Sequence, residues 1–187
     1  MAVLVLGWCI YFILHSVLAA GPVKEVFKKR WGKSFRYYRL GYVLFSATGV
    51  LLLLFLNSNI PGGYVMEREG LARYLSLLFA AFGVIVIKVA FREYGFSGFI
   101  GLAEERKSFS SQGILKSVRH PIYSGTILMM IGYWLFSPNI PTLVSVLCVF
   151  AYLPVGIYLE ERKLIKQFGE EYIRYKRDVP ALVPRLF

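Results

Sequence analysis

Two apolar stretches joined by a four-residue turn decide the fold of this chain: PIYSGTILMMIGYWLF over residues 121–136, SPNI over 137–140 and PTLVSVLCVFAYLPVGIYLE over 141–160. A helix crosses the apolar core of a bilayer with about 20 residues and satisfies its own backbone hydrogen bonds. We therefore predict two membrane helices, Pro121–Phe136 and Pro141–Glu160, which the short turn folds into a tight antiparallel hairpin. Pro154 and Gly156 are expected to bend the second helix.

Three further apolar stretches have a similar character: Ala2–Ala20, Tyr38–Leu56 and Leu71–Phe91. The whole chain of 187 residues is 57% hydrophobic, whereas soluble domains average about 45–50%. No polar linker is long enough to separate two domains. We expect an all-α, polytopic membrane protein with about five transmembrane helices, which forms a single domain over residues 1–187.

Lysine and arginine are concentrated in alternate connections. Residues 22–39 hold seven of them, residues 92–119 five and the chain from 161 onward seven, whereas the other connections offer Arg68 and Arg73. Basic loops stay on the cytoplasmic side, so we expect the N-terminus outside and the C-terminus in the cytoplasm, in a bacterial or archaeal cytoplasmic membrane. Anionic lipids then explain the net charge of +11 better than a nucleic-acid partner, which we do not expect.

The C-terminal tail has helical periodicity from Glu160 to Lys176. Its apolar positions recur at spacings of three and four residues: Leu164, Ile165, Phe168, Tyr172 and Tyr175. The pattern predicts an amphipathic helix that continues from the fifth span and lies on the cytoplasmic membrane surface. Pro180 and Pro184 then end the helical structure.

A cluster of polar residues is expected where the hairpin returns to the cytoplasm. Arg119, His120 and Pro121 stand at the mouth of the fourth span, and Glu160 and Glu161 end the fifth. The start of a helix offers free backbone N–H groups that favour an anion. Two neighbouring carboxylates beside an apolar slab need a cation, which a bound ligand or an arginine could provide.

Plainer interpretations remain open for the polar residues. Arg119 and His120 could anchor a helix to lipid headgroups, and the Glu160–Glu161 pair could face the neighbouring basic residues. His15, inside the first span, could hydrogen-bond another helix or act on a substrate. Cys9 and Cys148 lie in apolar stretches and predict neither a disulfide nor a metal site. The glycine-rich run over 95–101 favours a re-entrant or interfacial turn.

Two sequence motifs resemble a known superfamily. GILKSVRHPIYSG over residues 113–125 and EERKLIKQFGEEYIRYKRDVP over 160–180 are similar to the two motifs of the isoprenylcysteine carboxyl methyltransferases and phospholipid methyltransferases. They occur in the same order and at the same spacing as in that superfamily, and the motif-bearing part spans about residues 113–184.

The resemblance implies that S-adenosylmethionine binds between the last two spans and the tail helix. The residues that it assigns to the cofactor are Leu115, Val118, Arg119, His120, Pro121, Tyr123, Gly125, Glu160 and Glu161. A thiol or amine acceptor has to lose a proton, and His120, Glu161 and His15 are the candidates for the general base. The acceptor is expected to be small or lipid-like and to enter from the bilayer.

The choice of acceptor depends on a short stretch before Glu160. Isoprenylcysteine enzymes usually carry an arginine one turn earlier, whereas residues 154–158 here are PVGIY. The form GIYLEER resembles the methanethiol S-methyltransferases, as do Leu14–Ala19 and Tyr38–Leu40, although Ala90–Tyr94 departs from that subgroup. We therefore expect thiol S-methylation. The alternatives are carboxyl or phospholipid-amine methylation, an NADPH-dependent enzyme similar to sterol reductases, and a non-catalytic membrane scaffold.

Overall fold

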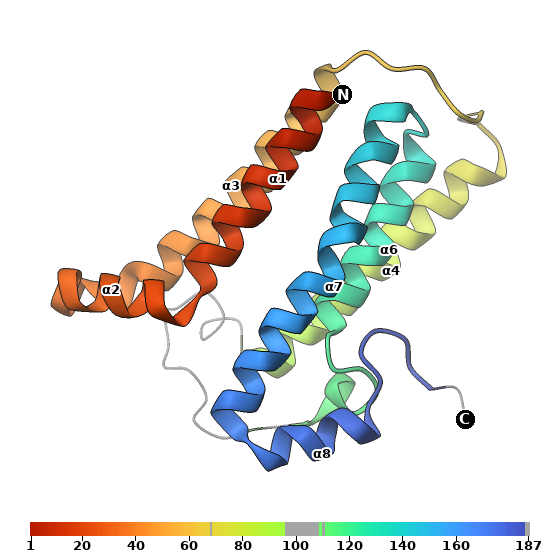
Figure 1. Ribbon diagram of the computed structural model, residues 1–187. Coiled ribbons are helices and arrows are strands. Elements are labelled where there is room, and N and C mark those ends of the chain that lie inside the picture. The colour runs from red at the N-terminus through yellow and green to blue at the C-terminus, as the bar shows by residue number, and fades with distance from the viewer. Residues whose placement is uncertain (68, 96–108, 110, 186–187) are drawn as a thin grey trace.

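The computed structural model describes residues 1–67, 69–95, 109 and 111–185, and helices make up its regular structure. Figure 1 shows their arrangement. Their bounds are α1 (Ala2–Ala19), α2 (Gly21–Trp31), η1 (Gly32–Tyr37), α3 (Tyr38–Asn59), α4 (Leu71–Tyr94), η2 (Gly113–Lys116), α6 (Pro121–Phe136), α7 (Ile140–Phe168) and α8 (Glu170–Asp178). This confirms the predicted all-α membrane fold. Of the expected turn over residues 95–101, all but Gly95 lies outside the described residues.

The expected spans are present, although α6 is shorter than the others. The segments Ala2–Ala19, Gly21–Asn59, Leu71–Tyr94 and Ile140–Phe168 are long and apolar enough to cross a membrane. The apolar helix α6 has 16 residues, which at 1.5 Å per residue extends about 24 Å against a hydrocarbon core of about 30 Å. Four helices therefore satisfy the length criterion and a fifth falls short of it.

The hairpin between α6 and α7 forms as predicted. The Asn139 side chain caps α7 by accepting a hydrogen bond of 2.8 Å from the Thr142 amide, and Pro141 occupies the first turn. The connection after α3 pairs with this turn, because the Val65 amide donates to the Pro138 carbonyl at 2.7 Å. Pro154 lies inside α7, which continues through it.

Helices α4 and α6 pack backbone against backbone (Figure 1). A Cβ atom on Gly83 would lie 2.7 Å from the Gly125 carbonyl oxygen, and one on Gly125 would lie 2.8 Å from the Gly83 carbonyl oxygen. About two turns further along α6, a Cβ on Gly132 would lie 2.7 Å from the Ser76 carbonyl oxygen. Glycines at these positions let two membrane helices approach closely and gain dispersion energy.

Helices α1 and α3 form a pair that contacts α7 (Figure 1). Leu4, Trp8 and Leu53 pack with Val149 and Leu153 in a buried apolar cluster. A polar network crosses the same contact: the Trp8 indole donates to Ser145 at 3.0 Å, and the Ser145 hydroxyl donates to the Asn57 side-chain oxygen at 2.9 Å. The Asn57 amide nitrogen in turn donates to Tyr133 and Thr142. Such bonds fix the register of helices that apolar contact alone would leave adjustable.

Two segments differ from the sequence-based predictions. The basic segment 22–39, expected as a connection, is helical, since α2 and η1 occupy it. The tail, expected as one helix from Glu160 to Lys176, is divided: α7 continues to Phe168, Gly169 adopts a φ of 56°, and α8 follows. A left-handed residue ends an α-helix, and glycine takes that conformation without steric cost. The predicted continuity through Gly169 was therefore wrong.

The close approach of α4 and α6 can be tested with an added methyl group. In Gly83→Ala the new Cβ would overlap the Gly125 carbonyl and Met129, so the helices have to separate. We expect a loss of about 1–3 kcal/mol in unfolding free energy, measured as a lower midpoint of thermal unfolding in detergent. The control is Gly41→Ala on α3, where a Cβ would meet nothing within 4 Å. Equal midpoints for the two variants would contradict the packing argument.

Candidate functional site

The start of α6 is held by the C-terminal tail. The backbone amides of Arg119 and His120 donate to the carbonyls of Pro180 and Ala181 at 2.9 and 3.0 Å. The Ser124 hydroxyl donates to the Leu182 carbonyl at 2.6 Å. The tail thus runs along the first turn of α6 and fixes the two residues that precede the helix.

A buried carboxylate, Glu161 near the end of α7, is the centre of the site. Its Oε1 atom accepts from Nη2 and Nε of Arg119 at 2.7 and 2.9 Å, and lies 3.1 Å from Nε2 of His120. Its Oε2 atom lies 2.6 Å from Nζ of Lys176 in α8. The Glu161 side chain is 7% exposed. A carboxylate removed from water is tolerated where cations and donors surround it, as they do here.

Arg119 links three parts of the chain. Besides its two bonds to Glu161, its Nη1 atom donates to the carbonyl of Lys176 at 2.9 Å and to that of Val179. One guanidinium therefore joins the beginning of α6, the end of α7 and the end of α8. Its planar set of donors suits this arrangement, which a lysine could not reproduce.

Glu160 has a different environment from its neighbour. Its side chain is 42% exposed, and Oε2 lies 3.6 Å from Nδ1 of His120. The hydroxyl of Tyr123 is within its hydrogen-bonding reach, and Tyr94 and Tyr42 are close enough to interact with it electrostatically. The two carboxylates of the pair are therefore unequal: Glu161 is saturated with donors, whereas Glu160 is accessible and has these three tyrosines within its electrostatic range.

Two tyrosines of α8 complete the cluster. The Tyr175 hydroxyl donates to the Leu115 carbonyl at 2.6 Å, and burial raises the pKa of Tyr175 to about 12, so the phenol remains a donor. Tyr172 is 1% exposed, and its hydroxyl has no hydrogen-bond partner among the described residues. Tyr172 is nevertheless within electrostatic range of Glu161 and Arg119. A buried hydroxyl without a partner is uncommon and marks a place where a ligand could bind.

The structure brings together four of the residues proposed from the sequence, namely Arg119, His120, Glu160 and Glu161, with Tyr123 beside them. Leu115, Val118 and Pro121 are buried around them, while Gly125 faces α4 in the helix–helix contact. Sequence reasoning missed Lys176, Tyr172 and Tyr94. The sequence does place Lys176 one turn after Tyr172, which indicates that the two side chains lie on the same face of the tail helix.

His15 lies in a separate polar group between α1 and α3. Its Nδ1 atom is 3.0 Å from the Ser46 hydroxyl and its Nε2 atom 2.9 Å from the Tyr42 hydroxyl. None of its described contacts involves His120, Glu160 or Glu161. The structure therefore places the two histidines of the chain in different environments.

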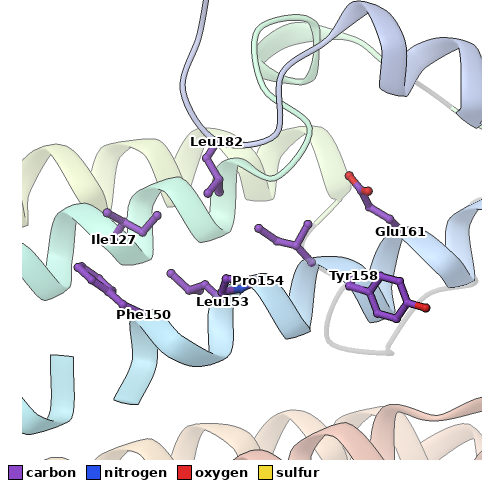
Figure 2. A pocket seen from close by; sticks show the side chains of 8 residues that line it. Ile127, Phe150, Leu153, Pro154, Tyr158, Glu161 and Leu182 are labelled. Carbon is purple, nitrogen blue, oxygen red and sulfur yellow. The ribbon is translucent and has the colours of Figure 1, made fainter. Parts of the chain in front are cut away.

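An apolar groove of about 480 Å³ runs between α6 and α7 and reaches Glu161. Figure 2 shows the side chains that line it, with Leu182 of the tail facing Ile127 of α6 and residues of α7. The lining residues are Ile127, Phe150, Leu153, Pro154, Ile157, Tyr158, Glu161 and Leu182. One end of the groove is thus charged and the rest apolar. No group of three or more metal-ligating side chains occurs within the described part of the chain.

Comparison with known proteins identifies the family. The phospholipid methyltransferase family profile matches residues 71–171. Methanethiol S-methyltransferase 2 and methanethiol S-methyltransferase 1 of Bradyrhizobium diazoefficiens are 33% and 32% identical to the chain over 95% and 94% of its length, which correspond to 71% and 64% of theirs.

A more distant relative matches a smaller part. Protein-S-isoprenylcysteine O-methyltransferase B of Arabidopsis thaliana is 30% identical over 43% of this chain and 42% of its own length. No solved structure gives a significant match. The helices long enough to span a bilayer, the Arg119–His120–Glu161 cluster between α6 and α7 and the family match agree with one another. The chain belongs to the phospholipid methyltransferase family and is an integral membrane methyltransferase.

Proposed function

We propose that the protein transfers the methyl group of S-adenosylmethionine to the sulfur of a small thiol, at the cytoplasmic end of its helices. The observation that carries this proposal is the unequal carboxylate pair: Glu161 is neutralised within the protein, whereas Glu160 is open to a cationic ligand. The thiol preference is supported by the two Bradyrhizobium relatives and by the lack of an arginine in residues 154–158, where a substrate carboxylate would need one.

The residues around Glu160 fit S-adenosylmethionine. A sulfonium or ammonium cation is attracted by a carboxylate and by aromatic rings. Glu160 is such a carboxylate, and Tyr94 and Tyr123 lie within its electrostatic range. The amides of Ile122 and Tyr123 have no acceptor within α6, because they lie in its first turn. They suit the carboxylate of the cofactor. The unpartnered hydroxyl of Tyr172 offers a further hydrogen bond.

When bound, S-adenosylmethionine supplies a methyl group that is already activated by the sulfonium charge. The contribution of the chain is then alignment and exclusion of water. Arg119 and Lys176 hold Glu161, and Glu161 orients the His120 ring through Nε2. His120 in turn faces Glu160 with Nδ1. Both ring nitrogens of His120 face carboxylates. This arrangement suits a ring that donates hydrogen bonds and positions Glu160, rather than one that acts as the general base.

The membrane orientation follows from the basic segments. In Figure 1, α2 and α8 lie toward the same end of the helix bundle, and the N-terminus of α1 lies at the other. α2 ends with Lys28, Lys29 and Arg30 in its last turn, and α8 ends with Lys176 and Arg177 in its last turn. By the positive-inside rule this end faces the cytoplasm, where the cofactor is available.

A lipid-like acceptor is the second candidate, and the apolar groove between α6 and α7 favours it. The groove reaches Glu161 from an apolar surface that a bilayer would cover. An isoprenyl or acyl chain could lie along Phe150 and Ile157 with its polar end toward the charged cluster. Such an acceptor would be methylated on a carboxylate or an amine.

Binding of the cofactor tests the role of Glu160. In Glu160→Gln the negative charge is lost while the size of the side chain is kept, so affinity for S-adenosylmethionine should fall about tenfold to a hundredfold, since charge-assisted hydrogen bonds contribute about 1.5–3 kcal/mol. The measurement is equilibrium binding of labelled cofactor to purified protein in detergent. The matched control is Glu170→Gln, an exposed carboxylate in the first turn of α8. Saturable binding of NADPH in place of the methyl donor would contradict the proposal.

The acceptor is tested by a screen with methyl-labelled cofactor. We expect volatile labelled thioether from methanethiol, and much lower transfer to a prenylcysteine analogue or to phosphatidylethanolamine vesicles. The physical reason is the lack of a cation in residues 154–158 for a substrate carboxylate. Equal or faster transfer to the prenylcysteine analogue would favour the groove as the acceptor site. Binding without transfer to any of these acceptors would contradict the proposed thiol chemistry.

A further inference from the structure

The polar group around His15 lies within membrane-spanning helices and makes no hydrogen bond to the Arg119–His120–Glu161 cluster. Besides the contacts of His15 with Ser46 and Tyr42, it includes the Tyr152 hydroxyl of α7, 2.9 Å from the Ser16 hydroxyl. Polar residues inside membrane helices are costly and commonly mark substrate or proton pathways.

The hydrogen bonds of Ser46 determine which nitrogen of His15 carries the proton. The Ser46 hydroxyl donates its one hydrogen to the Tyr42 carbonyl at 2.8 Å, so toward Nδ1 of His15 it can act only as an acceptor. We therefore assign the hydrogen to Nδ1 and the lone pair to Nε2. The Tyr42 hydroxyl lies 2.9 Å from Nε2 and 3.2 Å from Nδ1. Because Nδ1 is already a donor, we assign the Tyr42 hydrogen bond to Nε2.

This arrangement leaves Nε2 of His15 with a lone pair and a hydroxyl donor, whereas the other two candidate bases are held by charged partners. Glu161 already accepts from Arg119, His120 and Lys176, so little lone-pair capacity remains on it. His120 has a carboxylate at each ring nitrogen. Nε2 of His15, by contrast, has a phenol hydroxyl as its donor, and that bond can pass a proton in either direction.

Tyr152 of the His15 group and Glu160 of the site lie on the same face of α7. Tyr152, Gly156 and Glu160 follow one another at four-residue spacing on one face of α7. Tyr42 is within electrostatic range of Tyr152 and Glu160, and Tyr123 is within range of all three. A Cβ on Gly156 would lie 3.2 Å from the Tyr123 hydroxyl, so the glycine lets Tyr123 lie against α7.

The comparisons place this group in a part of the chain that the general family profile does not cover. The profile matches residues 71–171, whereas His15, Tyr42 and Ser46 precede it. The relatives named for methanethiol match 94–95% of this chain and the isoprenylcysteine relative 43%. The helices α1 and α3 lie outside the general profile, so residues specific for a thiol acceptor are sought there.

We infer that Tyr42 and His15 form the proton acceptor for a small thiol that binds where α1 and α3 meet α7, next to Glu160. This inference rests on the proposed thiol S-methylation. The S–H bond of the acceptor breaks, and its proton passes to the Tyr42 oxygen while the Tyr42 proton passes to Nε2 of His15. The sulfur electron pair forms the new bond to the methyl carbon. The pair of the broken C–S bond remains on the donor sulfur, which loses its positive charge, and the imidazolium returns its proton to water.

Histidine NMR tests the inference without turnover. The chain has two histidines, so His120→Asn in ¹⁵N-histidine-labelled full-length protein leaves the signals of His15 alone. We expect the neutral tautomer with hydrogen on Nδ1, and a shift of the Nε2 signal on addition of ethanethiol. Ser46→Ala should remove the preference for that tautomer. A resting tautomer with hydrogen on Nε2, or an Nε2 signal that ethanethiol does not move, would overturn the inference.

Kinetics provide the second test. His15→Asn can keep a hydrogen bond to Ser46 but cannot take up a proton, so methanethiol turnover should fall about 10²- to 10⁴-fold with cofactor affinity unchanged. The turnover of methanethiol by the Tyr42→Phe variant should also fall. Tyr11→Phe is the matched control, because the Tyr11 hydroxyl donates to the Ser46 carbonyl and not to the imidazole.

The pH profile separates loss of a proton acceptor from a merely distorted site. The titratable groups that face His15 are Tyr11 of α1, Tyr42 of α3 and Tyr152 of α7. Turnover of His15→Asn should rise in proportion to the ionised thiol between about pH 7 and pH 9, while native turnover is flatter. If the native protein methylates methanethiol and the His15→Asn variant is equally active, the inference about His15 is overturned, while the proposed function stands. A native protein that methylates no thiol would overturn the proposed function as well.

Discussion

The ion pair between Arg119 and Glu161 is the interaction on which the site depends. It forms at 2.7 Å between side chains that are each at most 9% exposed. The start of α6, the end of α7 and the end of α8, with Val179 directly after it, meet at these two groups. Removing Glu161 would leave the buried guanidinium of Arg119 without its carboxylate, which costs more than the pair itself contributes. The site is therefore one electrostatic unit built from three segments.

The membrane fold could be predicted from the sequence because hydropathy and chain length decide it. A span of about 20 apolar residues forms a helix in a bilayer, because a helix satisfies its own backbone hydrogen bonds there. A four-residue turn then makes two such helices antiparallel neighbours. That same turn brings Arg119 and His120 opposite Glu160 and Glu161. Half of the candidate site thus follows from connection length, without any knowledge of side-chain contacts.

The remaining half depends on contacts that periodicity does not specify. Tyr172 and Tyr175 occupy apolar positions of a tail that suggested a membrane surface, yet the structure buries them against Leu115 and the Glu161 cluster. The end of α7 at Gly169 lets α8 turn and deliver Lys176 to Glu161. Likewise, the sequence does not predict the hydrogen-bond partner of His15, because a lone polar residue can face several neighbouring helices. Its pairing with Tyr42 and Ser46 depends on how α1 and α3 are rotated.

The shortness of α6 connects the chemistry to the lipid. A helix of 16 residues falls about 6 Å short of an average hydrocarbon layer, and a deficit of that kind is met by local thinning or by tilt. The charged cluster stands at the first turn of α6, so its depth below the headgroups is set by the acyl chains around it. In a thick, sterol-rich bilayer the cluster would lie within the hydrocarbon layer, whereas in a thin bilayer it would lie at the interface with water. The thickness of the host membrane thereby changes how far water reaches the site, although no lipid has to bind there.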